Sequence, residues 1–321
     1  MAEAKAGMLQ QAEALAEALG LAWETRTLQR HPWLDLLPQC LWHSTGALGI
    51  HGLTPPWPDI IIASGRYAAR VALAIRAHRP EVALCQIQDP RWARRRFNVI
   101  VTPRHDATPG GNVIATLGSV HGITSSGLAT AASAWQDRLH PDSRPLLAVL
   151  LGGPTRHCRW SATAWEALLT QLEQLHREQA WRLAVSASRR TPPAWVDLAE
   201  QRLGSLCQVF YRGQAGDNPY RGMLGLADAI LVTADSVNML TEAAATEAVV
   251  YRWGEVRPHS RLARFHAAMA AAGHLQDWGL PIAARKRTPL LELPELAAAV
   301  CHRLGLGPAK PQPLPPAEAS T

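Results

Sequence analysis

Residues 227–251 read ADAILVTADSVNMLTEAAATEAVVY, and this stretch decides the fold class of the chain. Ile230, Leu231 and Val232 form a short apolar run, which is typical of a strand covered by helices on both faces. The polar residues 233–236 end that strand and precede a run suited to a helix. The stretch therefore predicts one β-α unit of a parallel sheet, and such sheets bind ligands at the carboxyl ends of their strands.

The turn of this unit carries candidate binding groups. Asp235 or Ser236 can cap the helix, because either side chain can accept a hydrogen bond from a backbone N–H of the first turn. Free amides at a helix start also bind phosphate. Glu242 lies nearly two helical turns beyond Ser236, on about the same face, and is within reach of a ribose hydroxyl. The alternative is that Asp235 is only a cap and Glu242 only a solvated helix residue.

Composition limits the class of protein. The chain has 321 residues, of which 47% are hydrophobic, and this is enough for two domains with their own cores. The net charge of +6 comes mostly from scattered arginines. This distribution favours phosphorylated ligands or an anionic membrane surface, and we expect no nucleic-acid partner.

Cysteine and histidine spacing argues against a metal site. The five cysteines lie far apart with no CxxC pair, so neither a zinc knuckle nor a disulfide framework is indicated, and a reducing, cytoplasmic compartment is expected. None of the thirteen histidines forms an HExxH pattern, so we expect no tightly held metal. No apolar h-region opens the chain and no run of about 18 apolar residues occurs, so any membrane contact would be peripheral, at the inner membrane. Such contact would use the basic and Trp-rich stretches Pro32–Trp57 and Arg91–Arg96.

The first half of the chain predicts a parallel sheet whose first strand is either missing or unrecognisable. Met8, Ala12, Leu15 and Leu19 recur at helical spacing before Gly20 with no clear strand ahead of them, and a truncated start is one expectation. The further strands are expected at Trp23–Leu28, at Asp59–Ser64 with a helix from Gly65, and in the runs EVALCQIQDPR (81–91), RFNVIVTPRHD (96–106) and NVIATLGSVHGIT (112–124).

The second half repeats the pattern. Its strands are expected in the runs PLLAVLLGGPTRH (145–157), WRLAVSASRRTP (181–192), CQVFYRGQAGDNPY (207–220) and AILVTADS (229–236). We therefore predict an α/β protein with two Rossmann-like domains facing a cleft, at residues 1–140 and 145–300, joined by the linker Pro141–Pro145. The proline-rich residues 305–321 are expected to be a disordered tail.

Polar clusters at the predicted strand ends supply further candidates for ligand binding. Two glycines after a strand let a backbone approach a phosphate, although a plain turn also explains them. An arginine pair beside hydroxyls suits phosphate recognition, although an exposed arginine pair needs no function. The candidates in the second half are Gly152, Gly153, Ser188, Arg189, Arg190, Thr191, Asn218, Tyr220, Asp235, Ser236, Met239 and Glu242.

The first half offers an acid/base pair and residues for the floor of a cleft. His105 beside Asp106 suggests general acid/base catalysis, because an adjacent carboxylate can raise the pKa of an imidazole. The alternative is a hydrogen-bonded loop histidine. The residues expected to line the cleft from this side are Gly65, Arg66, Gln88, Asp89 and Asn112.

The combination of QDPR, PRHD, NVIATLG, LGGP, SRRTP, DNPY and VTADSVNMLTEA resembles the mitochondrial fission family typified by the plant elongated-mitochondria protein, which has many bacterial members. The resemblance runs from about Gly7 to Gly279. It implies an architecture similar to GT-B glycosyltransferases, with Glu242 at a ribose and Ser236 at a diphosphate. It also implies a scaffold as the alternative, because the plant member recruits a dynamin-related protein. Glu247 and Val249 depart from the family's TGxPV turn, which weakens the expected helix stop near Thr246.

These observations predict a metal-independent glycosyltransferase that uses a nucleotide-sugar as its donor, holds no tightly bound cofactor and acts on an unidentified, cell-envelope acceptor. Ser236 and nearby amides would hold the diphosphate, Arg189 or Arg190 would neutralise the leaving group, and His105 or Asp106 would activate the acceptor. The rival hypothesis is a catalytically silent scaffold that recruits an unknown protein partner. An epimerase is less favoured, because the chain has no GxGxxG fingerprint and no YxxxK pair.

Overall fold

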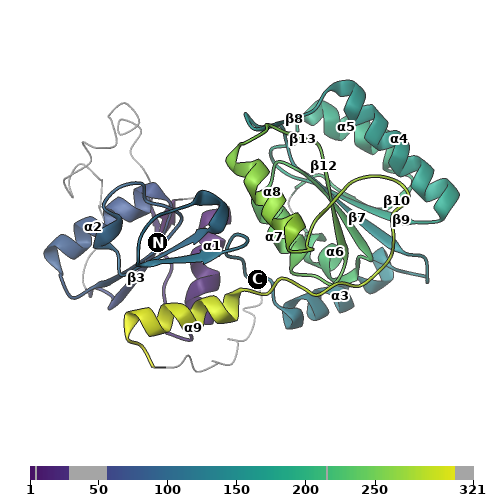
Figure 1. Ribbon diagram of the computed structural model, residues 1–321. Coiled ribbons are helices and arrows are strands. Elements are labelled where there is room, and N and C mark those ends of the chain that lie inside the picture. Colours follow the sequence, from purple (N-terminus) through teal and green to yellow (C-terminus); the bar gives the residue numbers. More distant parts are fainter. Residues whose placement is uncertain (4–5, 29–55, 215, 308–321) are drawn as a thin grey trace. The chain divides into compact units, whose positions relative to one another are not determined.

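A computed structural model describes residues 1–3, 6–28, 56–214 and 216–307 (Figure 1). The chain forms two compact units. The first unit contains residues 1–122 together with the segment from Glu292 onward, and the second unit contains residues 123–291. The predicted boundary between the domains, at residues 140–145, differs from the observed one. The second unit begins earlier, at residue 123, and the chain returns to the first unit at Glu292.

The first unit is built on a parallel six-stranded sheet in the order β2-β1-β3-β4-β5-β6. The expectation of a missing first strand is wrong, because β1 precedes α1 and pairs with both β2 and β3. Two residues are too few to produce a hydrophobic pattern, so this strand left no signal in the sequence. The strands are β1 Ala2–Glu3, β2 Thr27–Leu28, β3 Ile60–Ser64, β4 Ala83–Ile87, β5 Val99–Pro103 and β6 Val113–Thr116.

Helices cover both faces of this sheet. Alternate residues of β5 point to opposite faces, so Ile100 joins a core with α2, whereas Val99 and Val101 join a core with α1 and α9. The helices are α1 Ala6–Ala18, α2 Arg66–His78 and α9 Leu293–Leu304, and two short 3₁₀ helices are η3 Arg94–Arg96 and η4 Arg104–Asp106.

The last helix belongs to the first unit, although the sequence placed it in the second domain. The carboxylate of Glu292, at the start of α9, accepts hydrogen bonds from the backbone amides of Leu117 (2.7 Å) and Gly118 (3.0 Å), just after β6. Leu296 and Val300 of α9 then pack in the core that contains Leu15 of α1. Most of the tail expected at 305–321 lies outside the described residues.

The second unit has a parallel six-stranded sheet in the order β10-β9-β7-β11-β12-β14. In chain order this is the Rossmann arrangement, and its topological switch point lies between β7 and β11. The strands are β7 Leu146–Leu151, β9 Arg182–Ala187, β10 Cys207–Tyr211, β11 Ala229–Thr233, β12 Val249–Trp253 and β14 Gln276–Asp277. A separate antiparallel pair is formed by β8 Cys158–Arg159 and β13 Glu255–Val256.

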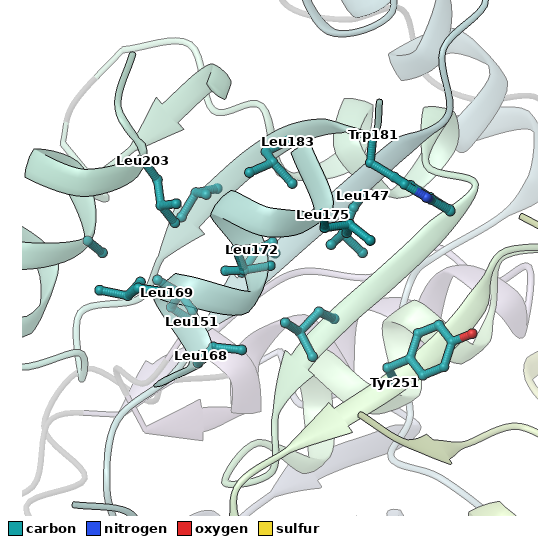
Figure 2. Close-up of a cluster of buried hydrophobic side chains, with 14 of the residues drawn as sticks. Leu147, Leu151, Leu168, Leu169, Leu172, Leu175, Trp181, Leu183, Leu203 and Tyr251 are labelled. Atoms are coloured by element: carbon teal, nitrogen blue, oxygen red, sulfur yellow. The ribbon is translucent and has the colours of Figure 1, made fainter. Parts of the chain in front are cut away.

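Leucines fill the core on one face of the second sheet (Figure 2). Leu168, Leu172 and Leu175 recur at helical spacing on α4 and pack against strand residues such as Leu147 and Leu183. The helices of this unit are α3 Ser125–Leu139, α4 Ala162–Gln179, α5 Pro193–Leu203, α6 Tyr220–Leu226, α7 Val237–Ala244 and α8 Arg261–Ala271.

Close packing places α3 in the second unit. A Cβ on Gly222 of α6 would lie 2.5 Å from the Trp135 side chain of α3, and one on Gly225 would lie 2.7 Å from the Leu128 carbonyl. The two glycines therefore let the helices approach closely. The predicted linker Pro141–Pro145 consequently lies inside this unit, where Asp142 pairs with Arg182 of β9.

Replacing Glu292 is expected to loosen α9 from the first unit. Glu292→Ala should lower the free energy of unfolding by about 2 kcal/mol, because two backbone amides lose a charged acceptor. Urea denaturation measures the change. Glu295→Ala removes an exposed carboxylate from the same helix and is the matched control. Equal effects of the two substitutions would contradict the anchoring role.

Candidate functional site

The switch point of the second sheet brings three loops together. Because all six strands are parallel, the turns that follow β7, β9 and β11 lie at the same carboxyl edge. These turns contain most of the predicted binding residues. We call the group formed by Gly152, Gly153, Arg190, Thr233 and Asp235 the switch-point cluster.

The carboxylate of Asp235 is the centre of the switch-point cluster. Its side chain is 0% exposed, and it accepts hydrogen bonds from the Thr233 hydroxyl (2.7 Å), the Gly153 amide (3.3 Å) and the Arg190 guanidinium (2.8 Å). Burial raises its pKa, whereas these partners oppose the rise. The sequence did not single out Thr233, whose hydroxyl also accepts from the Gly152 amide (2.6 Å). The only feature of the sequence that could have indicated Thr233 is its place at the end of a buried strand, two residues before Asp235.

Protein groups fill the space beside the two glycines. A Cβ on Gly152 would lie 2.1 Å from an Asp235 carboxylate oxygen, and one on Gly153 would lie 1.9 Å from the Arg190 carbonyl oxygen. Real Cβ atoms do not come this close, so a side chain at either position would displace the Asp235 carboxylate or the Arg190 backbone. Asp235 and Arg190 are the groups that come close to the two glycines, whereas the sequence suggested that a phosphate would.

The turn after β9 is fixed by its hydroxyls and exposes its arginines. Thr191 is buried, donates to the Leu151 carbonyl (2.9 Å) and accepts from the Ser188 amide (3.1 Å). The Arg190 side chain is 55% exposed and reaches Asp235. Arg189 is also exposed, and no hydrogen bond or ion pair joins its side chain to another of the described residues. Of the two predicted arginines, only Arg190 enters the switch-point cluster.

Helix α7 begins at Ser236 and carries Glu242. The Ser236 hydroxyl accepts from the Met239 amide (3.3 Å), so Ser236, rather than Asp235, is the cap. The Glu242 carboxylate accepts from the Tyr220 hydroxyl at 2.5 Å, and burial raises the pKa of both groups. Asn218 accepts from the Tyr220 amide (3.0 Å). These five predicted residues therefore fall into two groups: Ser236 with Met239, and Tyr220 with Glu242 and Asn218.

Arg287 stabilises the end of α7, where the sequence predicts a weak helix stop. Its guanidinium donates to the carbonyls of Ala243 (3.1 Å), Ala244 (2.7 Å) and Ala248 (2.7 Å), which satisfies the end of α7. It also contacts Nδ1 of His274 at 2.9 Å. Burial, and then the charge of Arg287, lower the pKa of His274, so the imidazole is kept neutral as an acceptor.

Predicted residues of the first unit lie at two different edges of its sheet. Gly65, Arg66, Gln88 and Asp89 follow β3 and β4, at the carboxyl edge. Gly65 has a φ of 90° and begins α2, and the guanidinium of Arg94 holds the pKa of Asp89 below its usual range. Asn112 precedes β6 and therefore lies at the amino edge, where its amide donates to the carbonyls of Arg94 (2.9 Å) and Phe97 (2.8 Å). Asn112 falls at the other edge because β6 begins at Val113, directly after it, and the sequence pattern does not fix that strand boundary.

The predicted acid/base pair is formed but buried. His105 Nε2 lies 3.4 Å from a carboxylate oxygen of Asp106, and their side chains are 1% and 5% exposed. The Thr102 hydroxyl reaches the same carboxylate at 3.5 Å. This burial favours the alternative that His105 is a structural loop residue, while its catalytic role stays a prediction.

The arginine-rich loop of the first unit is held in a fixed shape. Asp89 accepts from the Arg91 amide and from the Arg94 guanidinium (2.8 Å each), and Arg76 donates to the Arg96 carbonyl (2.8 Å). Arg91, Arg95 and Arg96 remain exposed. Of the Trp-rich stretch predicted to act with them, residues 32–55 lie outside the described residues.

The described residues show neither a group of metal ligands nor a membrane-spanning helix. Among the residues with described positions, no three His, Cys, Asp or Glu side chains gather as metal ligands would. In the same part of the chain, no helix has both the length and the apolar character needed to cross a membrane. The absence of a metal and of a tightly bound cofactor both stay predictions.

Known sequences are similar over most of the chain. A sequence model of the family described as "Mitochondrial fission ELM1" matches residues 6–304. The Mitochondrial fission protein ELM1 of Arabidopsis thaliana is 31% identical over 245 residues, which cover 69% of this chain and only 57% of the plant protein. The uncharacterized protein RP120 of Rickettsia prowazekii (strain Madrid E) is 25% identical over 290 residues, which cover 78% of this chain and 81% of that protein.

Solved structures share the fold at low sequence identity. UDP-GlcNAc 2-epimerase from Methanocaldococcus jannaschii aligns with a TM-score of 0.57 at 11% identity, over 94% of this chain and 98% of that one. UDP-GlcNAc 2-epimerase from Neisseria meningitidis, bound to UDP-GlcNAc, aligns with a TM-score of 0.51 at 12% identity, over 96% and 94%. These likenesses confirm the predicted fold class, an α/β protein with two Rossmann-like domains of the GT-B kind.

A side chain at position 152 is expected to disrupt the switch-point cluster. Gly152→Ala should lower the free energy of unfolding by about 2 kcal/mol, because the new methyl group would displace the Asp235 carboxylate from its partners. Chemical denaturation measures this loss. Gly111→Ala is the control, since a Cβ there meets nothing within 4 Å. A Gly152→Ala protein as stable as the control would show that the carboxylate is free to move.

Acidification is expected to weaken the anchor of α7. The pKa of His274 lies below its ordinary value of 6.5 in the folded state, so its contribution to stability is full above that pH and is lost as the pH falls below it. His274→Gln keeps an acceptor for Arg287 without a titrating ring, and its melting temperature should fall less on acidification than that of the wild type. His259→Gln, at an exposed histidine, is the control and should follow the wild type. Identical pH profiles for all three proteins would rule out the contribution of His274.

Proposed function

The chain belongs to the mitochondrial fission ELM1 family, and from this premise we propose that its second unit binds a nucleotide-sugar as the donor for glycosyl transfer. One observation carries the proposal: Arg190 is held on the buried Asp235 at the switch point, in the unit whose helix α7 carries Ser236 and Glu242. The solved proteins of similar fold add support, because they are UDP-GlcNAc 2-epimerases and one of them holds UDP-GlcNAc.

Three of the predicted binding residues have roles in this proposal. The first amides of α7, at Ser236, receive the diphosphate, since a helix start is positive and has free N–H donors. The exposed guanidinium of Arg190 neutralises the charge that develops on the leaving diphosphate. Glu242 accepts from a ribose hydroxyl in place of the Tyr220 hydroxyl that it binds in the structure. No metal is needed if these groups stabilise the diphosphate.

The reaction has one close alternative. The sequence disfavoured an epimerase because two motifs are absent, yet solved UDP-GlcNAc 2-epimerases share this fold. The same donor site therefore suits either transfer to an acceptor, such as a component of the cell envelope, or rearrangement of the sugar. Incubation with a radiolabelled nucleotide-sugar and chromatography of the products distinguishes the two, because only transfer separates the sugar from its nucleotide in a new glycoside.

A second candidate function is a scaffold that recruits a protein partner. The internal pairing of Glu242 with Tyr220 favours it, since this predicted binding group is satisfied without a ligand. The relative in Arabidopsis is named as a fission protein. In this proposal the protein is cytoplasmic, and the exposed Arg91, Arg95 and Arg96 contact an anionic membrane.

A thermal-shift screen against UDP, GDP, ADP, CMP and their sugar conjugates tests the donor site. A ligand at about 100 times its Kd stabilises the folded protein by about 2.7 kcal/mol, so one nucleotide class should raise the melting temperature. Glu242→Ala should lose most of that shift. Glu247→Ala removes an exposed carboxylate just beyond the same helix and should keep it. No shift with any compound would favour the scaffold, and an unchanged shift in Glu242→Ala would contradict the role of Glu242.

Sedimentation with anionic vesicles at low salt tests the membrane contact. The triple variant Arg91→Gln, Arg95→Gln, Arg96→Gln should bind less than the wild type, because it removes three exposed cations from a loop that its other contacts hold in place. A wild type that stays in the supernatant would end this part of the proposal.

A further inference from the structure

We propose that Asp235 is a positioning residue, which holds the Arg190 guanidinium so that its free N–H donors receive a phosphate group of the ligand. The inference rests on the proposed function, and it names the chemistry of the ligand group, a phosphate or diphosphate, and the residue that makes Arg190 competent to bind it. Asp235 itself does not contact the ligand, because its side chain is 0% exposed.

The two partners differ sharply in exposure. The Asp235 side chain is 0% exposed and the Arg190 side chain is 55% exposed, although they lie 2.8 Å apart. A guanidinium has five N–H donors in a planar fork, and Asp235 engages one of its nitrogens. The remaining donors are available at the surface of the carboxyl edge. Planar, bidentate recognition of phosphate is the task for which arginine is suited.

The backbone beneath Arg190 is also fixed. Its amide donates to the Ser188 hydroxyl (3.3 Å), and its carbonyl packs directly over Gly153. Thr191, the next residue, is tied to the Leu151 carbonyl of β7. Arg190 is therefore held at the backbone by its own turn and at the guanidinium by Asp235. Such preorganisation lowers the entropy that a flexible arginine loses when it binds an anion.

Neighbouring Arg189 provides the internal comparison. It carries the same charge and is exposed, yet no contact among the described residues fixes its side chain. General electrostatic attraction would make the two arginines nearly equal in their effect on an anion. If Asp235 positions Arg190, then Arg190 contributes more to anion binding than Arg189 does.

The charge of Asp235 separates positioning from simple attraction. A carboxylate near an anion site repels the anion, so by Coulomb's law its removal should strengthen binding. If Asp235 instead orients Arg190, the neutral variant Asp235→Asn should weaken binding. The two explanations therefore predict changes of opposite sign for one nearly isosteric substitution.

Isothermal titration of the full chain with inorganic pyrophosphate tests the inference. Arg190→Gln should weaken binding about tenfold or more, the size expected when a charge-assisted hydrogen bond is lost. Arg189→Gln should weaken it by less, about threefold or below, and Asp235→Asn should weaken it about threefold to tenfold. Circular dichroism and melting temperature verify that each variant is folded.

Arg190→Lys is a second test of the inference, which applies even if the Asp235→Asn protein does not fold. It keeps the charge at an exposed position but loses the planar fork, so it should bind pyrophosphate more weakly than Arg189→Lys. Tighter binding by Asp235→Asn, equal losses at Arg189 and Arg190, or no pyrophosphate binding by the wild type would each overturn the inference. Pyrophosphate binding that depends on Arg190, without any nucleotide-sugar binding, would uphold it while the proposed donor fails. Nucleotide-sugar binding that is unchanged in Arg190→Gln would support the proposed donor and overturn this inference.

Discussion

The buried carboxylate of Asp235 is the constraint on which the carboxyl edge of the second sheet depends. A charge taken out of water costs several kcal/mol unless it is paired and hydrogen-bonded. Two of the partners, Gly153 and Arg190, come from loops that are distant in sequence and adjacent in the sheet, and the third, Thr233, ends the strand just before Asp235. The same carboxylate fills the space beside Gly152, so a larger residue there would displace it. One charge thus fixes the glycine pair after β7 and the arginine turn after β9.

The predicted ribose-binding carboxylate is already satisfied within the protein. Glu242 accepts from Tyr220, so a nucleotide-sugar would exchange this contact rather than fill an empty one. Such an exchange is favourable only where the ligand supplies hydrogen bonds at least as good, because an unpaired buried group is costly. A scaffold would keep the present pair unchanged. The two proposed functions therefore compete for the same atoms, and the fold, which active and inactive proteins can share, does not choose between them.

Helix α7 shows how a departure in sequence is compensated in space. The expected weakness of its end, where Glu247 and Val249 replace a glycine and a proline, is met by Arg287, whose guanidinium donates to three carbonyls near that end. Thr246 adds a hydroxyl bond to the Ala243 carbonyl. Ser236 at the other end of α7 and Glu242 along it thereby keep a fixed position. Arg287 lies far beyond the helix in sequence, so no local pattern could assign it this role.

The sequence by itself determined the parallel α/β class and the buried strands, since apolar runs such as Ile60–Ser64, Leu146–Leu151 and Ala229–Thr233 are local patterns imposed by burial on both faces. It also identified the turns that carry Gly152, Arg190 and Asp235. Only the tertiary structure decided which side chains meet there, that His105 and Asp106 are buried, and that Asn112 lies at the opposite edge from Gly65. It also decided the unit boundaries, because α3 is held by its close approach to Gly222 and Gly225 of α6, and α9 by Glu292 at the end of β6. The physical reason is that periodicity reports how each segment is buried, whereas packing distances and hydrogen bonds between distant segments exist only once the chain has folded.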